Sequence, residues 1–230
     1  MANEYFRKVP DLEYVNRLPN SKIGDYIQVK NFFKRGKIRP DIFQNLMFFE
    51  KYKVIGDDRP DNVAYKFYGD ANLDWIVLIS NNILSIQTEW PLTQNSFDQY
   101  LFEKYKVSGD TETDTYNRIY NGIHHYETVS ATNSSGTILV KEGLWVDENY
   151  SLTYYDELIS AYSTIYPVAP ITNYEYEEKI EDNKRNIFLI KQRYLNVIID
   201  DMDDIMKYKK GSSQYKTETL KTADNIRIYS

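Results

Sequence analysis

The clearest hydrophobic periodicity in the chain lies near its end. Apolar side chains recur there at i, i+3, i+4, i+7, i+10 and i+11, which places them on one face of a helix. These positions are Leu195, Ile198, Ile199, Met202, Ile205 and Met206. A second stripe, formed by Phe97, Leu101 and Tyr105, predicts another amphipathic helix within residues 91–107.

The stretch from Met47 to Ile83 has a different pattern, in which short apolar runs alternate with turn residues. We expect an extended segment from Met47 to Ile55. A helix begins at Pro60, because proline suits the first helical position, and ends at Gly69. A second helix follows and stops at Asn81-Asn82, after which residues 83–87 are expected to pair back on residues 51–55. Two helices on a pair of strands bury both apolar helix faces.

The rest of the chain is predicted from local signals. Two β-rich runs joined by TNSSG indicate a hairpin within residues 123–147. Residues 172–185 are expected to be helical and residues 186–191 to form a strand. Nearer the start, a short helix is predicted over residues 11–18, and Gly36 is expected to end a helix within residues 25–39. The fold class is therefore α+β.

Composition narrows the function classes. The formal net charge is −6 and there is no cysteine, so the sequence favours neither a nucleic-acid partner nor a disulfide framework. The longest apolar run, WIVLI at residues 75–79, is too short to span a bilayer. The first residues lack the apolar core of a signal peptide, so we expect no export signal. The 22 tyrosines suit either a protein interface or a tyrosine-rich core.

Part of the central stretch resembles a LysM module, a small sugar-binding fold of order βααβ. The matching features are YKV, GD, Ala64, the Tyr68-Gly69 pair and Asn81-Asn82. The turn GDDRP and the missing Gly-Gln-x-Leu-x-Ile-Pro ending depart from the sugar-binding pattern. This resemblance implies an alternative function, the binding of peptidoglycan or chitin.

A longer resemblance covers roughly three quarters of the chain by order of features. The residues after Gly56 resemble the baseplate wedge protein family, gene product fifty-three, of T-even-type contractile-tailed phages. The features that carry it are Arg59-Pro60, Ala64, Tyr68-Gly69, Trp75, Leu78, Asn81, Trp90, Phe97, Tyr100 and Lys104-Tyr105, the acid-rich helix, strand and final helix of residues 172–206, and NFFKRGK near the start. Residues 123–147 have no counterpart in the family pattern.

This resemblance implies a structural subunit of a baseplate wedge, assembled in the host cytoplasm and carried in the virion. Such a subunit joins wedges to one another and to the central hub. The implied partners are the wedge-core proteins, the lysozyme-like sheath-priming subunit, the hub and neighbouring copies. The predicted segments are an N-terminal docking segment (1–50), the LysM-like module with its following helix (51–106), the hairpin insertion and an aromatic linker (107–170), a helix-strand-helix (171–208) and a polar tail (209–230), flexible by itself.

For the interface we select one arginine and four large aromatic residues, because arginine, tyrosine and tryptophan carry much of the energy at protein interfaces. They are Arg59, Tyr68, Trp75, Trp90 and Trp145. Packing within the module is the competing explanation for Tyr68 and Trp75. The basic stretch KNFFKRGKIR is expected to dock an acidic partner rather than nucleic acid.

We find no pattern that predicts catalysis, a metal site or a cofactor. His124 and His125 are adjacent in a predicted strand, where neighbouring side chains point to opposite faces. The acidic run at residues 200–204 lacks the spacing of a calcium loop and is expected to be a solvated or ion-paired helix face. There is no nucleophile–histidine–acid set and no phosphate-binding loop, so we expect no enzyme.

Overall fold

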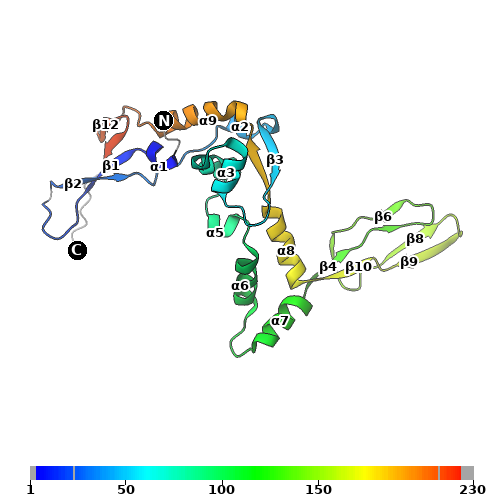
Figure 1. The fold of residues 1–230 in the computed structure, drawn as a ribbon. Coiled ribbons are helices and arrows are strands. Elements are labelled where there is room, and N and C mark those ends of the chain that lie inside the picture. The colour runs from blue at the N-terminus through cyan, green and yellow to red at the C-terminus, as the bar shows by residue number, and fades with distance from the viewer. Residues whose placement is uncertain (1–3, 23, 212, 224–230) are drawn as a thin grey trace. The chain divides into compact units, whose positions relative to one another are not determined.

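The computed structural model describes residues 4–22, 24–211 and 213–223 (Figure 1). The chain forms two compact units, each considered separately below. The first unit comprises Met1–Trp90 and Arg185–Ser230, and the second comprises Pro91–Lys184. No helix among the described residues is long and apolar enough to cross a membrane.

The first unit is built on one antiparallel strand pair and two packed helices. Strand β3 (Phe49–Lys53) pairs with β11 (Asn186–Ile190), and helices α3 (Pro60–Tyr68) and α4 (Asp74–Ser80) pack beside them. Pro60 occupies the first turn of α3, and Gly69 ends it with a φ of 81°, a left-handed conformation that glycine adopts without strain. The start and end of α3 are confirmed. The extended segment is confirmed over Phe49–Lys53, whereas its first two residues belong to a short helix, η1 (Leu46–Phe48).

The predicted closing strand at residues 83–87 is wrong. Ile86–Glu89 form a short helix, α5, and β3 pairs with β11 instead, with Phe49 opposite Ile190. The physical reason lies in the apolar content of β11, because Leu189 and Ile190 are fully buried. A strand that is buried on both faces reads as a continuous apolar run, as NIFLI does.

One side chain also ties β11 to the end of α4. The Asn81 amide nitrogen donates to the carbonyl oxygen of Phe188 at 2.9 Å, and the Asn81 side-chain oxygen accepts from the Phe188 N–H at 2.7 Å. The same amide nitrogen donates to the Val77 carbonyl at 2.8 Å. Asn81 therefore satisfies the backbone of β11 as a neighbouring strand would.

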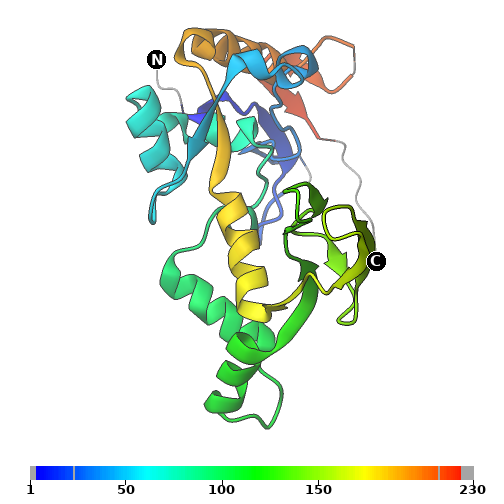
Figure 2. The same ribbon diagram turned by 90° about the vertical axis from the view of Figure 1, so that its right-hand side faces the viewer.

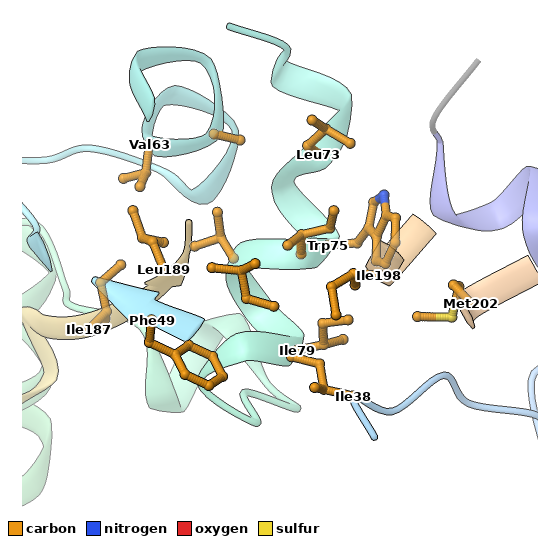
Figure 3. Packing of buried hydrophobic residues seen from close by; sticks show 14 of the residues in the cluster. Ile38, Phe49, Val63, Leu73, Trp75, Ile79, Ile187, Leu189, Ile198 and Met202 are labelled. Atoms are coloured by element: carbon orange, nitrogen blue, oxygen red, sulfur yellow. The ribbon is translucent and has the colours of Figure 1, made fainter. Parts of the chain in front are cut away.

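The core of the first unit joins these elements to the final helix, α9 (Leu195–Met206). Figure 3 shows side chains from β3, β11 and α4 converging with those of α9. Ile198, Met202 and Met206 are each no more than 2% exposed, which confirms the centre of the apolar stripe predicted for this helix, whereas Ile205 is 36% exposed. Gly36 faces the same layer, and a Cβ atom there would overlap the Met202 thioether.

The same unit contains a four-stranded sheet of order β12-β13-β1-β2. Its strands are β1 (Asp11–Val15), β2 (Tyr26–Lys30), β12 (Tyr215–Thr217) and β13 (Leu220–Thr222). The helices predicted over residues 11–18 and within 25–39 are therefore wrong, because DLEYV and YIQVK are short, partly exposed segments that pair with each other antiparallel.

β13 pairs parallel with β1, so part of the tail that was predicted to be flexible is ordered. Residues 224–230 of the tail lie outside the described residues. Short helices complete the first unit: α1 (Tyr5–Lys8), α2 (Pro40–Phe43), η1 (Leu46–Phe48), η2 (Ala71–Leu73) and η3 (Gln192–Tyr194).

The second unit combines helices with small antiparallel sheets. Helices α6 (Gln94–Tyr105), α7 (Glu112–Asn121) and α8 (Asn173–Lys184) lie together in Figure 2 and bury Phe97, Leu101 and Ile119. The predictions of α6 and α8 are confirmed. α7 was not among the predicted helices, and its start is fixed by a capping box between Thr111 and Asp114.

Three sets of strands follow α7. One sheet has the order β10-β4-β7, formed by β10 (Val168–Thr172), β4 (Ile123–Thr128) and β7 (Trp145–Val146). β5 (Ala131–Thr132) pairs with β6 (Ile138–Val140) around the predicted TNSSG turn, so the hairpin is confirmed. β8 (Leu152–Asp156) pairs with β9 (Ala161–Ile165) in a further hairpin.

A buried carboxylate connects α6 and α8. Glu177 is 4% exposed, and it accepts hydrogen bonds from Lys104 at 2.6 Å and from the Tyr105 hydroxyl at 3.0 Å. Burial raises the pKa of Tyr105, and the hydrogen bond to Glu177 raises it further, to about 12. Burial lowers the pKa of Lys104, but the bonds to Glu177 and Tyr100 outweigh this effect and raise it overall.

Candidate functional site

An apolar groove of about 930 Å³ opens on the first unit, lined by α1, by the start of α3, by η2 and α4, and by the segment around α5. The apolar residues that line it are Tyr5, Phe6, Pro60, Ala71, Trp75, Leu78, Ile79, Ile83, Leu84, Ile86 and Trp90. Leu84 and Ile86 are 66% and 48% exposed, so apolar surface continues from the groove onto its rim. An exposed apolar groove of this size is typical of a binding site.

The two groove tryptophans are held firmly by their surroundings. Trp75 and Trp90 are each 4% exposed, and the Trp75 ring lies 6.0 Å from the Tyr5 ring, centre to centre. The Trp90 indole N–H donates to the Asp58 carbonyl at 3.0 Å. Each tryptophan therefore belongs to the core while one part of its surface lines the groove.

Charged side chains stand around the same groove. Arg59 precedes the first turn of α3, its side chain is 78% exposed, and it pairs with Asp61 at 3.3 Å. Arg35 and Glu4 also line the groove. Asp74 lies deeper, and burial raises the pKa of its carboxyl group, against the lowering effect of the Trp75 N–H, which donates to it at 2.7 Å.

Tyr68 has a structural position outside the groove. Its hydroxyl donates to the Ile190 carbonyl at 2.9 Å, and burial raises its pKa despite that hydrogen bond. Tyr68 therefore connects the end of α3 to β11. The structure brings Arg59, Trp75 and Trp90 together at one groove and places Tyr68 elsewhere in the same unit.

Trp145 lies in the second unit, on β7, and is 63% exposed. Its ring stacks on His125 with 4.0 Å between the ring centres, and His124 stacks on Tyr176 at 3.8 Å. Trp145 and His124 are thus the exposed members of a small aromatic cluster between β4, β7 and α8.

The expectation that His124 and His125 point to opposite faces is wrong, because their Nδ1 atoms lie 2.8 Å apart. The cause is a bulge in β4. His125 pairs with Ile171 and Ile123 pairs with Thr172, which leaves His124 as the extra residue. A bulge breaks the strict alternation of side chains along a strand.

The pair continues into a charged chain of contacts. His125 Nε2 lies 3.0 Å from Glu127 Oε1, and Lys179 donates to the same oxygen at 2.9 Å. The bonds from Lys179 and then from His125 hold the pKa of Glu127 below its usual range. Within the described ranges, no group of three or more acidic, histidine or cysteine side chains is placed to hold a metal ion.

Two groove residues were not anticipated from the sequence. Leu84 and Ile86 fell within the strand that we expected at residues 83–87, where they would have been packed on residues 51–55. No local signal shows that this segment leaves the strand pair, since residues 84–87 alternate between apolar and polar as a strand does. Their exposure at the rim follows from the replacement of that strand by β11.

Comparisons with known proteins are consistent with the sequence pattern. The model of one protein family, described as base plate wedge protein 53, matches residues 5–208, which includes most of both units. Among curated proteins, the chain is similar to the baseplate wedge protein gp53 of Enterobacteria phage T4. The two are 23% identical over 184 residues, which cover 76% of this chain and 87% of that protein.

Proposed function

The chain belongs to the base plate wedge protein 53 family, and from that membership we propose that it joins baseplate wedges to one another and to the central hub. Membership gives it a structural role in the tail baseplate of a phage virion. The observation that carries the proposal is the extent of the match, because residues 5–208 take in the groove and the second unit alike.

The groove of the first unit is the proposed contact with a neighbouring wedge subunit. An apolar segment of that subunit would cover Leu84 and Ile86 and meet the small part of Trp75 and Trp90 that lines the groove. Large aromatic side chains that are fixed before binding lose little conformational freedom, which favours affinity. Arg59 at the rim would contribute more to specificity for a partner of complementary charge than to affinity.

The remaining features of the role follow from the family resemblance. The partners are the wedge-core proteins, the lysozyme-like sheath-priming subunit, the hub and neighbouring copies, and assembly takes place in the host cytoplasm. The work is done by binding energy rather than by covalent chemistry. Trp145, exposed on the second unit, is proposed as a second contact.

A pull-down with two baits tests this proposal. The purified chain is offered to immobilised baseplate proteins of the same phage and, separately, to insoluble peptidoglycan or chitin. Retention by the baseplate proteins alone supports the proposal. Saturable glycan binding that short N-acetylglucosamine oligomers compete away would support the alternative, a LysM-type glycan-binding protein.

The groove is tested by a matched pair of variants. Leu84→Asp places a charge at the groove rim, whereas Leu46→Asp makes the same change at a 70% exposed leucine that does not line the groove. We expect the first variant to lose retention by the baseplate proteins and the second to keep it. Equal retention of both variants would remove the groove from the proposal.

A further inference from the structure

A second hollow of the first unit collects positive charge. It measures about 270 Å³ and lies beside the end of α9, where residues 34 and 205–209 meet strands β12 and β13. Four lysines line it: Lys34, Lys207, Lys209 and Lys221. Tyr208 and Tyr215 complete its walls. The concentration is unusual because the chain as a whole carries a net charge of −6.

Two of these lysines are explained by local structure. Lys34 donates to the Lys207 carbonyl at 2.7 Å and lies 4.8 Å from the centre of the Tyr208 ring. Lys207 pairs with Asp204 at 2.8 Å. Both contacts are near the C-terminal end of α9, where cations counter the negative end of the helix dipole.

That explanation does not extend to the other two lysines. Among the described residues, Lys209 and Lys221 have no acidic partner within salt-bridge distance. Burial lowers the pKa of Lys34, and the positive charge of Lys209 lowers it further. The pocket therefore brings like charges together at a cost that an entering anion would relieve.

An exposed aromatic pair directly precedes Lys34. Phe32 and Phe33 are 73% and 96% exposed, and Phe32 makes an edge contact with Phe6 at 6.0 Å between ring centres. The loop that carries them is fixed by Asn31, which donates to the Tyr208 hydroxyl at 2.8 Å and accepts from the Phe33 N–H at 3.1 Å. Exposed aromatic side chains on a loop whose backbone is fixed are typical of protein interfaces.

We infer that the lysine pocket and the Phe32-Phe33 pair together bind an acidic segment of another protein. Aspartate or glutamate carboxylates would enter the pocket, and apolar side chains of the same segment would cover the two phenylalanines. This inference rests on the proposed function for the source of the segment, which is another protein of the baseplate.

The surroundings favour a carboxylate over a phosphate or a nucleic acid. Asp203, Asp204 and Glu218 lie close enough to Lys207 to raise its pKa, after the hydrogen bond to Asp204 itself. These acidic groups would repel a doubly charged phosphate more than a single carboxylate. The rest of the chain is acidic, which disfavours a long nucleic acid strand.

The test measures binding of a blocked synthetic peptide of alternating glutamate and leucine to the full chain by fluorescence anisotropy. We expect saturable binding that weakens with salt, and no binding of the peptide in which glutamine replaces every glutamate. The double variant Lys209→Ala, Lys221→Ala should bind about tenfold more weakly, the loss expected for charged hydrogen bonds. Phe33→Ala should also weaken binding, because the ring is an exposed anchor.

Lys210→Ala is the matched control, since Lys210 is an exposed lysine beside Lys209 that does not line the pocket. It should bind the peptide as the unchanged chain does. If Lys210→Ala weakens peptide binding as much as the double variant does, the peptide is held by the general positive charge of this region rather than by the pocket, and the inference is overturned. Failure of the glutamate peptide to bind would also overturn the inference. The same holds if single-stranded DNA or inorganic phosphate displaces the bound peptide at a lower concentration than unlabelled peptide does.

The inference and the proposed function fail separately. If the chain is retained by baseplate proteins but not by the glutamate peptide, the acidic segment is wrong and the wedge role stands. If the peptide binds at the lysine pocket but no baseplate protein retains the chain, the surface is real and the proposed source of its partner is wrong.

Discussion

Replacing Asn81 tests the claim that β11, rather than residues 83–87, closes the first unit. The Asn81→Ala substitution removes three hydrogen bonds, two of which satisfy the N–H and the carbonyl of Phe188.

The expected cost follows from the groups left unpaired. A backbone N–H or carbonyl that loses its partner in a buried position costs about 1–3 kcal/mol. Phe188 is partly buried, so water would recover some of this loss. We therefore expect Asn81→Ala to lower the free energy of unfolding of the first unit by about 2–4 kcal/mol.

Tryptophan fluorescence isolates the first unit in this measurement. Trp75 and Trp90 belong to it and Trp145 belongs to the second unit, so urea unfolding is followed in a Trp145→Phe background. Asn82→Gly is the control, because Asn82 is exposed and has a φ of 54°, which glycine adopts freely. It should change stability by less than about 0.5 kcal/mol. If Asn81→Ala costs no more than this control, the account of β11 is refuted.

Three further substitutions have defined outcomes. Tyr105→Phe should reduce the loss of stability at alkaline pH. The pKa of Tyr105 is raised from 10.0 to about 12 in the folded chain, so the stability that this residue contributes is complete below pH 10 and is lost toward pH 12. Urea unfolding measured across that pH range would show the difference between the variant and the unchanged chain. Gly36→Ala should lower the free energy of unfolding by about 1–3 kcal/mol, because the new methyl group overlaps Met202. In a double-mutant cycle, Met202→Ala should recover part of that loss. Additive effects of the two substitutions would contradict the overlap. Trp145→Ala should cost only about 0.5–1.5 kcal/mol in thermal unfolding, since its exposed ring mainly stacks on His125, and a loss above about 3 kcal/mol would show that it belongs to a core.

The sequence predicted well those elements whose signals are local. The apolar stripe of α9, the proline and glycine that bound α3 and the turn between β5 and β6 each lie within a few residues of the structure that they specify. The capping box of Thr111 and Asp114 was also a local signal, and it should have indicated α7.

The errors concern pairings between distant parts of the chain. β3 pairs with a strand more than a hundred residues later, and β1 pairs parallel with β13 near the other end of the chain. Periodicity shows that a segment can form a strand but does not identify its partner. The convergence of His124 and His125 was missed for a related reason, since a bulge depends on the register with β10.

Of the five residues proposed for the interface, three line one groove and two lie elsewhere. Arg59, Trp75 and Trp90 meet at one groove, while Tyr68 holds β11 and Trp145 lies on the other unit. The basic stretch that was expected to dock an acidic partner supplies Lys34 to the lysine pocket, whose other lysines come from the end of α9 and from the tail. Sequence alone could not show that these two segments meet.

Sedimentation velocity of purified wedges that lack this chain shows whether the chain joins baseplate wedges. Wedges are run alone, with the added chain, and with the Leu84→Asp variant. We expect the added chain to shift wedges into larger complexes that contain it, and the variant to do so poorly. Wedges that form the same complexes without the chain would contradict this role.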